Sequence, residues 1–148
     1  MGKSTPLSSV LFEQVRNKRG LAYSATSNFS PYSARGPFIV QLKTRAEKTS
    51  EAVTVVKDVV QQYIAKGPTE AQLTAAKKNL IGGFPLLFDS NNKILNVVSS
   101  LAINGRPLNY FDGYINRVSS LTPKKIQKAF RETLSPEKML VVTVGPKQ

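Results

Sequence analysis

The stretch from residue 11 to residue 23, LFEQVRNKRGLAY, restricts the fold most, because it joins the end of a helix to the start of a strand. Its first part has the spacing of an amphipathic helix. Gly20 suits the left-handed backbone position just past a helix end, where Leu21 can fold back onto the preceding turn. This reversal would bring Arg16 and Tyr23, seven positions apart, to one helix–strand corner.

Two strands are expected around this corner. A helix over residues 10–19, capped by Ser8 or Ser9, leads into it. Residues 22–29 alternate and contain Tyr, Thr and Phe, and residues 36–44 place Phe, Val and Leu on one side. Because turn-forming residues connect these two segments, we predict an antiparallel pair of strands.

A series of helices is predicted next. Thr44 and Glu47 have the spacing of a capping box that opens a long helix, and Gly67 ends it. Thr69 and Gln72 have the same spacing at the start of the following helix. The residues expected to face inward from the successive helices are Val53, Val56, Val60, Tyr63 and Ile64; Leu73, Ala76 and Leu80; Ile94, Val97, Val98 and Leu101; Phe111, Ile115 and Val118; and Ile126, Ala129, Phe130 and Leu134.

The end of the chain completes an α+β pattern. Ser90 is expected to cap a helix that runs to Asn104, and Thr122, followed by proline, to cap the last helix. Residues 139–144 are almost all apolar and predict a strand that is central in the sheet. The element order predicts one domain, residues 1–148, with two layers: helices packed on one face of a mostly antiparallel sheet.

Composition limits the chemistry available to the chain. It contains no histidine and no cysteine, which excludes a histidine zinc site, disulfides and thiol catalysis. The net charge of +12 would attract anionic partners such as nucleic acid. However, the basic residues are spread along the chain without a run of five like charges, so solvated helix faces are the simpler interpretation. The longest apolar runs are far too short to span a membrane.

The order of these motifs resembles the M16 family of zinc metallopeptidases, which includes pitrilysin, insulinase and the mitochondrial processing peptidase. Segment 11–23 is similar to the family's Arg-x-x-x-Gly-Leu-Ala-Tyr segment, which belongs to the C-terminal type of lobe that binds no zinc. Further matches are the turn at residues 66–70, the Ala-Lys pair at 76–77, the Gly-Arg-Pro run at 105–107 and the closing Val-Gly at 144–145. The resemblance implies the LuxS/MPP-like metallohydrolase fold.

A full lobe of that family carries further strands before the helix expected at residues 10–19. Almost nothing precedes that helix here, so we expect a partial lobe, truncated at its N-terminus. Residues 1–6 would be an edge introduced by cloning or a disordered end. Missing strands would leave an exposed sheet edge, which favours self-association.

The resemblance also implies a function. The chain would be the zinc-free lobe or subunit of a zinc metalloendopeptidase, closing over a catalytic lobe that holds Zn²⁺ with a His-x-x-Glu-His motif. Arg16 and Tyr23 would contact carbonyl groups of a peptide substrate, or the oxyanion of the tetrahedral intermediate, across the interface between lobes. The chain alone would bind no cofactor and cleave nothing. Bacterial relatives are often exported, which favours a periplasmic or exported location.

Arginine and tyrosine suit that chemistry. Attack on a peptide carbonyl places negative charge on its oxygen, and donors already aimed at this oxygen stabilise the transition state. Arg16 offers several N–H donors and a permanent charge, and Tyr23 offers one neutral O–H donor. The residues alone also allow Arg16 to be merely solvated and Tyr23 to pack in the sheet. Glu13 has no histidine near it and is expected to be a solvated carboxylate.

Two other functions stay open. The first is a structural M16 homologue that keeps the fold without proteolysis. The second is a basic nucleic-acid-binding domain, which is less favoured because no predicted element gathers basic and aromatic side chains together.

Overall fold

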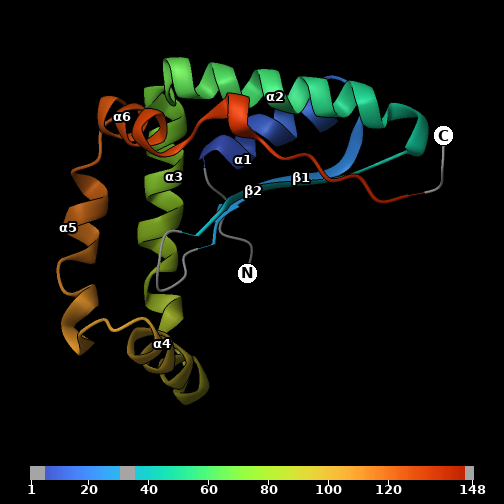
Figure 1. Cartoon of the computed structure of the whole chain (residues 1–148). Coiled ribbons are helices and arrows are strands. Elements are labelled where there is room, and N and C mark those ends of the chain that lie inside the picture. Colours follow the sequence, from blue (N-terminus) through green and yellow to red (C-terminus); the bar gives the residue numbers. More distant parts are fainter. Residues whose placement is uncertain (1–5, 31–35, 146–148) are drawn as a thin grey trace.

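The computed structural model describes residues 6–30 and 36–145 (Figure 1). Helix α1, Pro6–Leu11, continues directly into η1, a π-helical turn over Phe12–Asn17. The helix predicted for residues 10–19 therefore begins earlier, and its second half is wider than an α-helix. Ser8 and Ser9 lie inside α1, so the prediction that one of them caps it is wrong. The first residues of the proposed disordered end, 1–5, lie outside the described residues.

The predicted pair of strands is confirmed. β1, Ala22–Phe29, and β2, Phe38–Thr44, run antiparallel, and their register extends from Ala22 opposite Thr44 to Phe29 opposite Phe38. One irregularity interrupts the ladder, between Ala22 and Ser24. Ser8 ties α1 to the sheet, because its hydroxyl lies 2.9 Å from the backbone N–H of Ser27, which donates to it.

The chain between residues 46 and 138 is mainly helical. The longer helices are α2 (Thr49–Lys66), α3 (Glu70–Gly83), α4 (Asn91–Ile103), α5 (Tyr114–Ser119) and α6 (Pro123–Thr133). Short 3-10 turns occur at η2 (Ala46–Lys48), η3 (Pro85–Leu87), η4 (Leu108–Phe111) and η5 (Pro136–Lys138). No helix in the described ranges has the length and apolar character needed to cross a membrane.

Most of the predicted helix starts are confirmed. Thr69 and Gln72 form a complete capping box, and Ser90 and Thr122 each accept a hydrogen bond from the backbone of the first helical turn. The box predicted at residues 44–47 is wrong. The hydroxyl of Thr44 donates instead to the carbonyl of Leu21, 2.5 Å away, and η2 precedes the long helix.

Helices α1 and α2 lie on the same face of the two strands and bury the core between the layers (Figure 1). The two-layer α+β arrangement is therefore as predicted. In α2 the buried residues follow helical spacing. Val53 is only half-buried, whereas Ala52 and Val59, which were not among the predicted inward residues, are buried. The buried members of the core are Leu7, Leu11, Val15, Leu21, Ala22, Ala25, Ala52, Val56, Val59, Val60, Tyr63 and Ile64.

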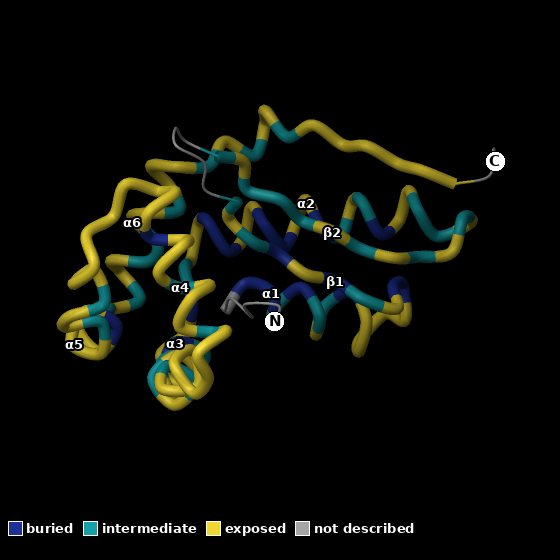
Figure 2. The backbone as a smooth tube through the Cα atoms, turned by 90° about the horizontal axis from the view of Figure 1, so that it is seen from below, coloured by how far each residue is buried: buried dark blue, intermediate teal, exposed yellow. Residues whose placement is uncertain are grey.

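Helices α3, α4 and α5 form an arm that extends away from this core (Figure 1). Figure 2 shows that most of the arm is exposed, with Leu73, Leu101 and Val118 as its buried apolar residues. The aromatic residues around η3 and η4 pack against one another: Phe84, Phe88, Tyr110, Phe111 and Tyr114. They form a small cluster of their own, as their helical spacing suggested.

Several predicted inward faces are wrong. On the arm, Leu80, Ile94, Val98 and Ile115 are exposed, because no other element of the described chain covers their side of the helices. On α6, Ala129 is exposed, whereas Phe130 packs against the core.

The central strand predicted over residues 139–144 is also wrong. The sheet of the described chain contains β1 and β2 alone, and residues 139–145 run past β2 without pairing with it. In Figure 1 this segment lies along the body below α2, and Figure 2 shows it separated from β2. Its apolar composition correctly predicted an extended conformation, but extended chain becomes sheet only when a partner backbone lies beside it.

Candidate functional site

The first half of the candidate site is the π-helical turn η1, which carries Arg16. The hydrogen bond that defines this turn spans five residues, from the N–H of Lys18 to the carbonyl of Glu13, over 3.0 Å. The side chain of Arg16 is exposed, and its guanidinium carbon lies 4.7 Å from the centre of the Phe12 ring. In the described chain the guanidinium makes no hydrogen bond or ion pair, so this cation–π contact is what holds it. Single π turns inside helices are frequent at functional sites.

Gly20 makes the predicted reversal. Its φ of +60° is in the left-handed region, and its N–H donates to the carbonyl of Arg16 over 2.9 Å. The N–H of Leu21 donates to the carbonyl of Val15 over 2.9 Å, and the side chains of Leu21 and Val15 are both buried. The predicted fold-back of Leu21 is therefore confirmed, and it fixes the start of β1 against η1.

The second half of the site is Tyr23, which lies at the irregularity in the ladder. Ala22 pairs with Thr44 and Ser24 pairs with Lys43, which leaves Tyr23 as the extra residue of a β-bulge. With strict alternation, Tyr23 would point to the same side as the buried Ala25. The bulge breaks this phase, so that Ala22 is buried and Tyr23 is 70% exposed. Tyr23 therefore does not pack in the sheet.

The structure thus places both predicted residues at one corner with their side chains exposed. In the described chain Arg16 and Tyr23 make no hydrogen bond with each other, and each leaves its donor groups available to an outside acceptor. Sequence reasoning missed Phe12 as a support for Arg16. Its spacing of four residues from Arg16 on a helix could have revealed it.

The corner was also searched for metal ligands. The described residues contain no group of three or more His, Cys, Asp or Glu side chains that could hold a metal ion. Glu13, the carboxylate of the turn, is exposed and accepts a hydrogen bond from the amide of Asn17 over 2.7 Å. It behaves as the solvated carboxylate that we predicted.

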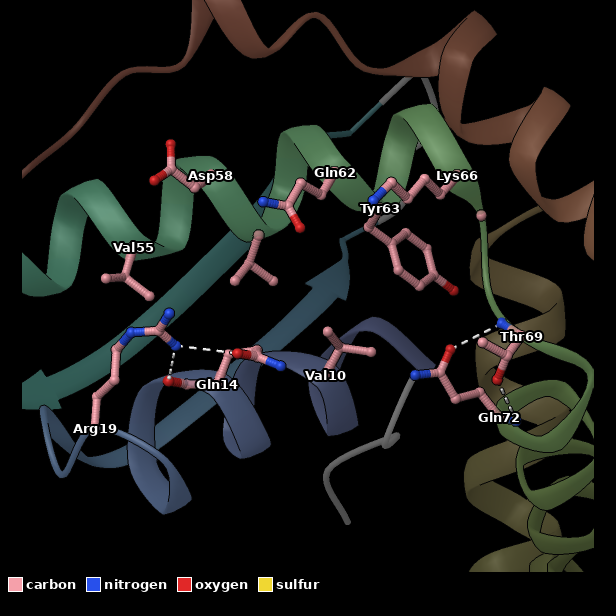
Figure 3. Close-up of a pocket in the computed structure, with 12 residues that line it drawn as sticks. Val10, Gln14, Arg19, Val55, Asp58, Gln62, Tyr63, Lys66, Thr69 and Gln72 are labelled. Atoms are coloured by element: carbon pink, nitrogen blue, oxygen red, sulfur yellow. Dashed lines mark hydrogen bonds between the residues drawn. The ribbon is translucent and has the colours of Figure 1, made fainter.

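A small cavity of about 310 Å³ lies behind the corner, between α1, η1, α2 and the turn before α3 (Figure 3). Arg19 lies at one end, where its guanidinium donates to the backbone and side-chain oxygens of Gln14 over 2.8 and 3.0 Å. Tyr63 projects from α2 into this space, and its hydroxyl has no hydrogen-bond partner in the described chain. Burial raises the pKa of Tyr63 to about 12. The arrangement is a feature of packing, since no nucleophile or acid–base pair converges there.

Comparison with known proteins assigns the fold to a family. The profile described as the peptidase M16 inactive domain matches residues 2–80. A solved structure of a peptidase M16 inactive domain from Pseudomonas fluorescens is 34% identical, with a TM-score of 0.79 over 86% of this chain and 30% of that chain. The periplasmic protease PqqL from Escherichia coli shares the fold at 19% identity, with a TM-score of 0.75 over 89% of this chain and 15% of the other.

Curated relatives are consistent with this assignment. A protein of Helicobacter pylori described as the non-peptidase homolog YmxG is 34% identical over 78% of this chain and 27% of its own length. An uncharacterized zinc protease of Streptomyces coelicolor is 27% identical over 95% of this chain and 30% of its own length. The chain therefore spans less than a third of the curated relatives that it matches. Because the profile match at residues 2–80 covers more than half of the chain, including the corner itself, the chain belongs to the family of the peptidase M16 inactive domain.

Proposed function

We propose that this chain acts as the zinc-free lobe of an M16-type metalloendopeptidase. It closes over a catalytic lobe that holds Zn²⁺, and it presents Arg16 and Tyr23 to the peptide bound between the lobes. The observation that carries the proposal is the exposure of both side chains at one corner, with Arg16 on the π turn and Tyr23 on the β-bulge.

The roles of the two residues follow from their surroundings. Arg16 is not neutralised by a carboxylate in the described chain, so its full charge remains for a developing oxyanion. The ring of Phe12 restricts the guanidinium without consuming its N–H donors. Tyr23 adds a neutral donor on a backbone that the ladder with β2 holds in place. Donors that are fixed before the reaction stabilise the charge of the transition state most effectively.

The test is peptide hydrolysis by this chain combined with a catalytic lobe of the same family that carries His-x-x-Glu-His. We expect Arg16→Ala and Tyr23→Phe each to lower kcat by about 10²-fold or more, as loss of an oxyanion donor does. Lys18→Ala is the matched control, because it removes the same charge from the same exposed turn and should change kcat little. Unchanged rates for both site variants would remove the catalytic role from this corner.

A second candidate function is supported by the relative described as a non-peptidase homolog. In that case the chain would associate with a catalytic or structural lobe without contributing to hydrolysis. The same reconstitution distinguishes the two functions, since a structural lobe would bind its partner with equal affinity in the wild type and the Arg16→Ala variant. Hydrolysis would then be absent, or insensitive to both substitutions.

A further inference from the structure

The π turn η1 holds two pairs of side chains, and the members of each pair are four residues apart. The ring of Phe12 faces the guanidinium of Arg16, whose carbon lies 4.7 Å from the ring centre. The amide of Asn17 donates to a carboxylate oxygen of Glu13 over 2.7 Å. The cation of the turn is thus matched with a ring and its anion with an amide, although the two opposite charges are only three residues apart.

The cation and the anion of the turn could have paired with each other. Opposite charges three or four residues apart on a helix are neighbours and attract one another. Lys48 and Glu51, which have the same spacing of three at the start of α2, do form an ion pair over 2.9 Å. Glu13 and Arg16 form none in the described chain. A feature specific to this turn therefore keeps them apart.

The width of the turn accounts for part of this separation. An α-helix has about 3.6 residues per turn, so the positions three and four ahead both lie near the starting position. A turn closed by a hydrogen bond that spans five residues, here from Lys18 to Glu13, holds about one residue more. The extra residue rotates the position three ahead away and keeps the position four ahead on the same side. Arg16 therefore lies beside Phe12, and Asn17 lies beside Glu13.

The amide of Asn17 accounts for the rest. The width of the turn alone does not prevent Glu13 from reaching Arg16, because both side chains are long, exposed and able to change rotamer. The hydrogen bond from Asn17 holds the carboxylate on its own side of the turn. Because the acceptor is charged, this bond is stronger than one between two neutral groups.

We infer that Asn17 is a positioning residue for Arg16: it occupies Glu13 and so keeps the guanidinium free for the peptide. The inference rests on the proposed function, in which Arg16 offers its full charge to the oxyanion. A carboxylate bound to Arg16 would consume N–H donors and cancel that charge. Exposed pairs at this spacing form with an equilibrium constant of about 2. Without Asn17, Glu13 would therefore hold Arg16 for about two thirds of the time.

The first experiment uses the full chain alone and follows the side-chain N–H signal of Arg16 by NMR. Asn17→Ala should move this signal downfield, because the guanidinium then donates to the carboxylate of Glu13. Combining Asn17→Ala with Glu13→Gln should return the signal to its wild-type position, since a neutral amide attracts the guanidinium far less. Added salt should reverse part of the shift in Asn17→Ala, because it screens exposed ion pairs.

The second experiment measures hydrolysis by the chain combined with a catalytic lobe that carries His-x-x-Glu-His. Asn17→Ala should lower kcat about threefold, which corresponds to the time that Arg16 spends bound to Glu13. Glu13→Gln alone should leave kcat unchanged, and in the double variant it should restore the wild-type value. A merely structural role of Asn17 would not be rescued by removal of a charge. Asn96→Ala is the matched control, because Asn96 is exposed in α4 and its loss should not change kcat.

The outcomes separate this inference from the proposed function. The inference is overturned if Asn17→Ala leaves the Arg16 signal in place, as it would if Glu13 turned to Lys18 instead. It is also overturned if kcat falls in Asn17→Ala and Glu13→Gln does not restore it, or if kcat is unchanged in Asn17→Ala but falls in Arg16→Ala. If Arg16→Ala hydrolyses peptide as fast as the wild type, the proposed function fails. The NMR signal of the chain alone then still decides whether Asn17 keeps Glu13 away from Arg16.

Discussion

The buried hydroxyl of Tyr63 yields the sharpest prediction about stability. Tyr63 is 4% exposed, and its hydroxyl has no hydrogen-bond partner in the described chain. Its ring packs edge-on against Phe130, with ring centres 5.1 Å apart. Tyr63→Phe keeps the ring and its contacts and removes only the hydroxyl, so we expect it to stabilise the fold.

The size of the gain follows from the cost of burying an unpaired polar group. That cost is about 1–3 kcal/mol, and removal of the group with no loss of packing should return about 1–2 kcal/mol. For a chain of this length, such a change raises Tm by roughly 2–8 °C. Tyr110→Phe is the control, because Tyr110 is exposed on the arm and the same deletion there should change stability by less than about 0.5 kcal/mol.

The same residue predicts a dependence on pH. Burial raises the pKa of Tyr63 to about 12, whereas an unfolded tyrosine titrates near 10. Between pH 10 and pH 12 the unfolded chain loses this proton and the folded chain keeps it, so stability falls as pH rises. The total loss is on the order of 3 kcal/mol, and it is absent below pH 10. Tyr63→Phe should remove this part of the alkaline decline.

Urea denaturation at fixed protein concentration, repeated from pH 7 to pH 11, measures both effects on the same pair of proteins. The lysines also titrate at the upper end of this range, but they are common to both proteins and cancel in the difference. If Tyr63→Phe is no more stable than the wild type at pH 7 and declines in parallel with it above pH 10, the hydroxyl is paired in the folded protein. The reasoning from its burial would then be refuted.

Three further substitutions test the local structure. Gly67→Ala should cost about 2–4 kcal/mol in urea denaturation, because φ is +72° and the added carbon would lie 2.9 Å from Cβ of Gln127. Gly20→Ala is the comparison, since φ is +60° but no atom lies within 4 Å of the added carbon, and it should cost only about 1–2 kcal/mol. Equal costs for the two substitutions would contradict the predicted clash. Thr69→Ala should cost about 1 kcal/mol through loss of the capping box, against a near-zero effect of Thr74→Ala in the exposed middle of α3. Phe130→Ala should lower Tm by at least 5 °C, because its ring joins Phe29, Phe38 and Tyr63; a smaller shift in calorimetry would show that α6 contributes little to the core.

Sequence signals that act over a few residues predicted the structure well. Gly20 has the expected left-handed conformation, β1 has the expected bounds, and the capping box at Thr69 forms as its spacing requires. Each of these features is decided by backbone geometry and hydrogen bonds within one turn. The same reasoning failed at Thr44, whose hydroxyl has a competing acceptor 23 residues away in sequence, at Leu21.

Features that depend on distant partners were predicted poorly. An apolar stripe on α4 shows that Ile94 and Val98 suit a core, but it cannot show whether another element will cover them. Residues 139–144 have the composition of a central strand, yet a strand is defined by its neighbours, and none is paired with this segment in the described chain. In both cases the sequence correctly identified surface that suits burial, and the structure shows that surface uncovered.

The two features that define the candidate site were invisible to periodicity, because each depends on a single residue. The π turn holds one residue more than an α-helical turn, and the β-bulge sets Tyr23 as an extra residue against β2. Val15, Leu21 and Ala22 are buried on both sides of Gly20, so the core continues through the two irregularities. Regular helix and strand would offer better hydrogen bonding at both places. Departures from regularity that leave the core intact are expected where function requires them. Here the π turn carries Arg16 and the β-bulge carries Tyr23, and both side chains are exposed, as the proposed function requires.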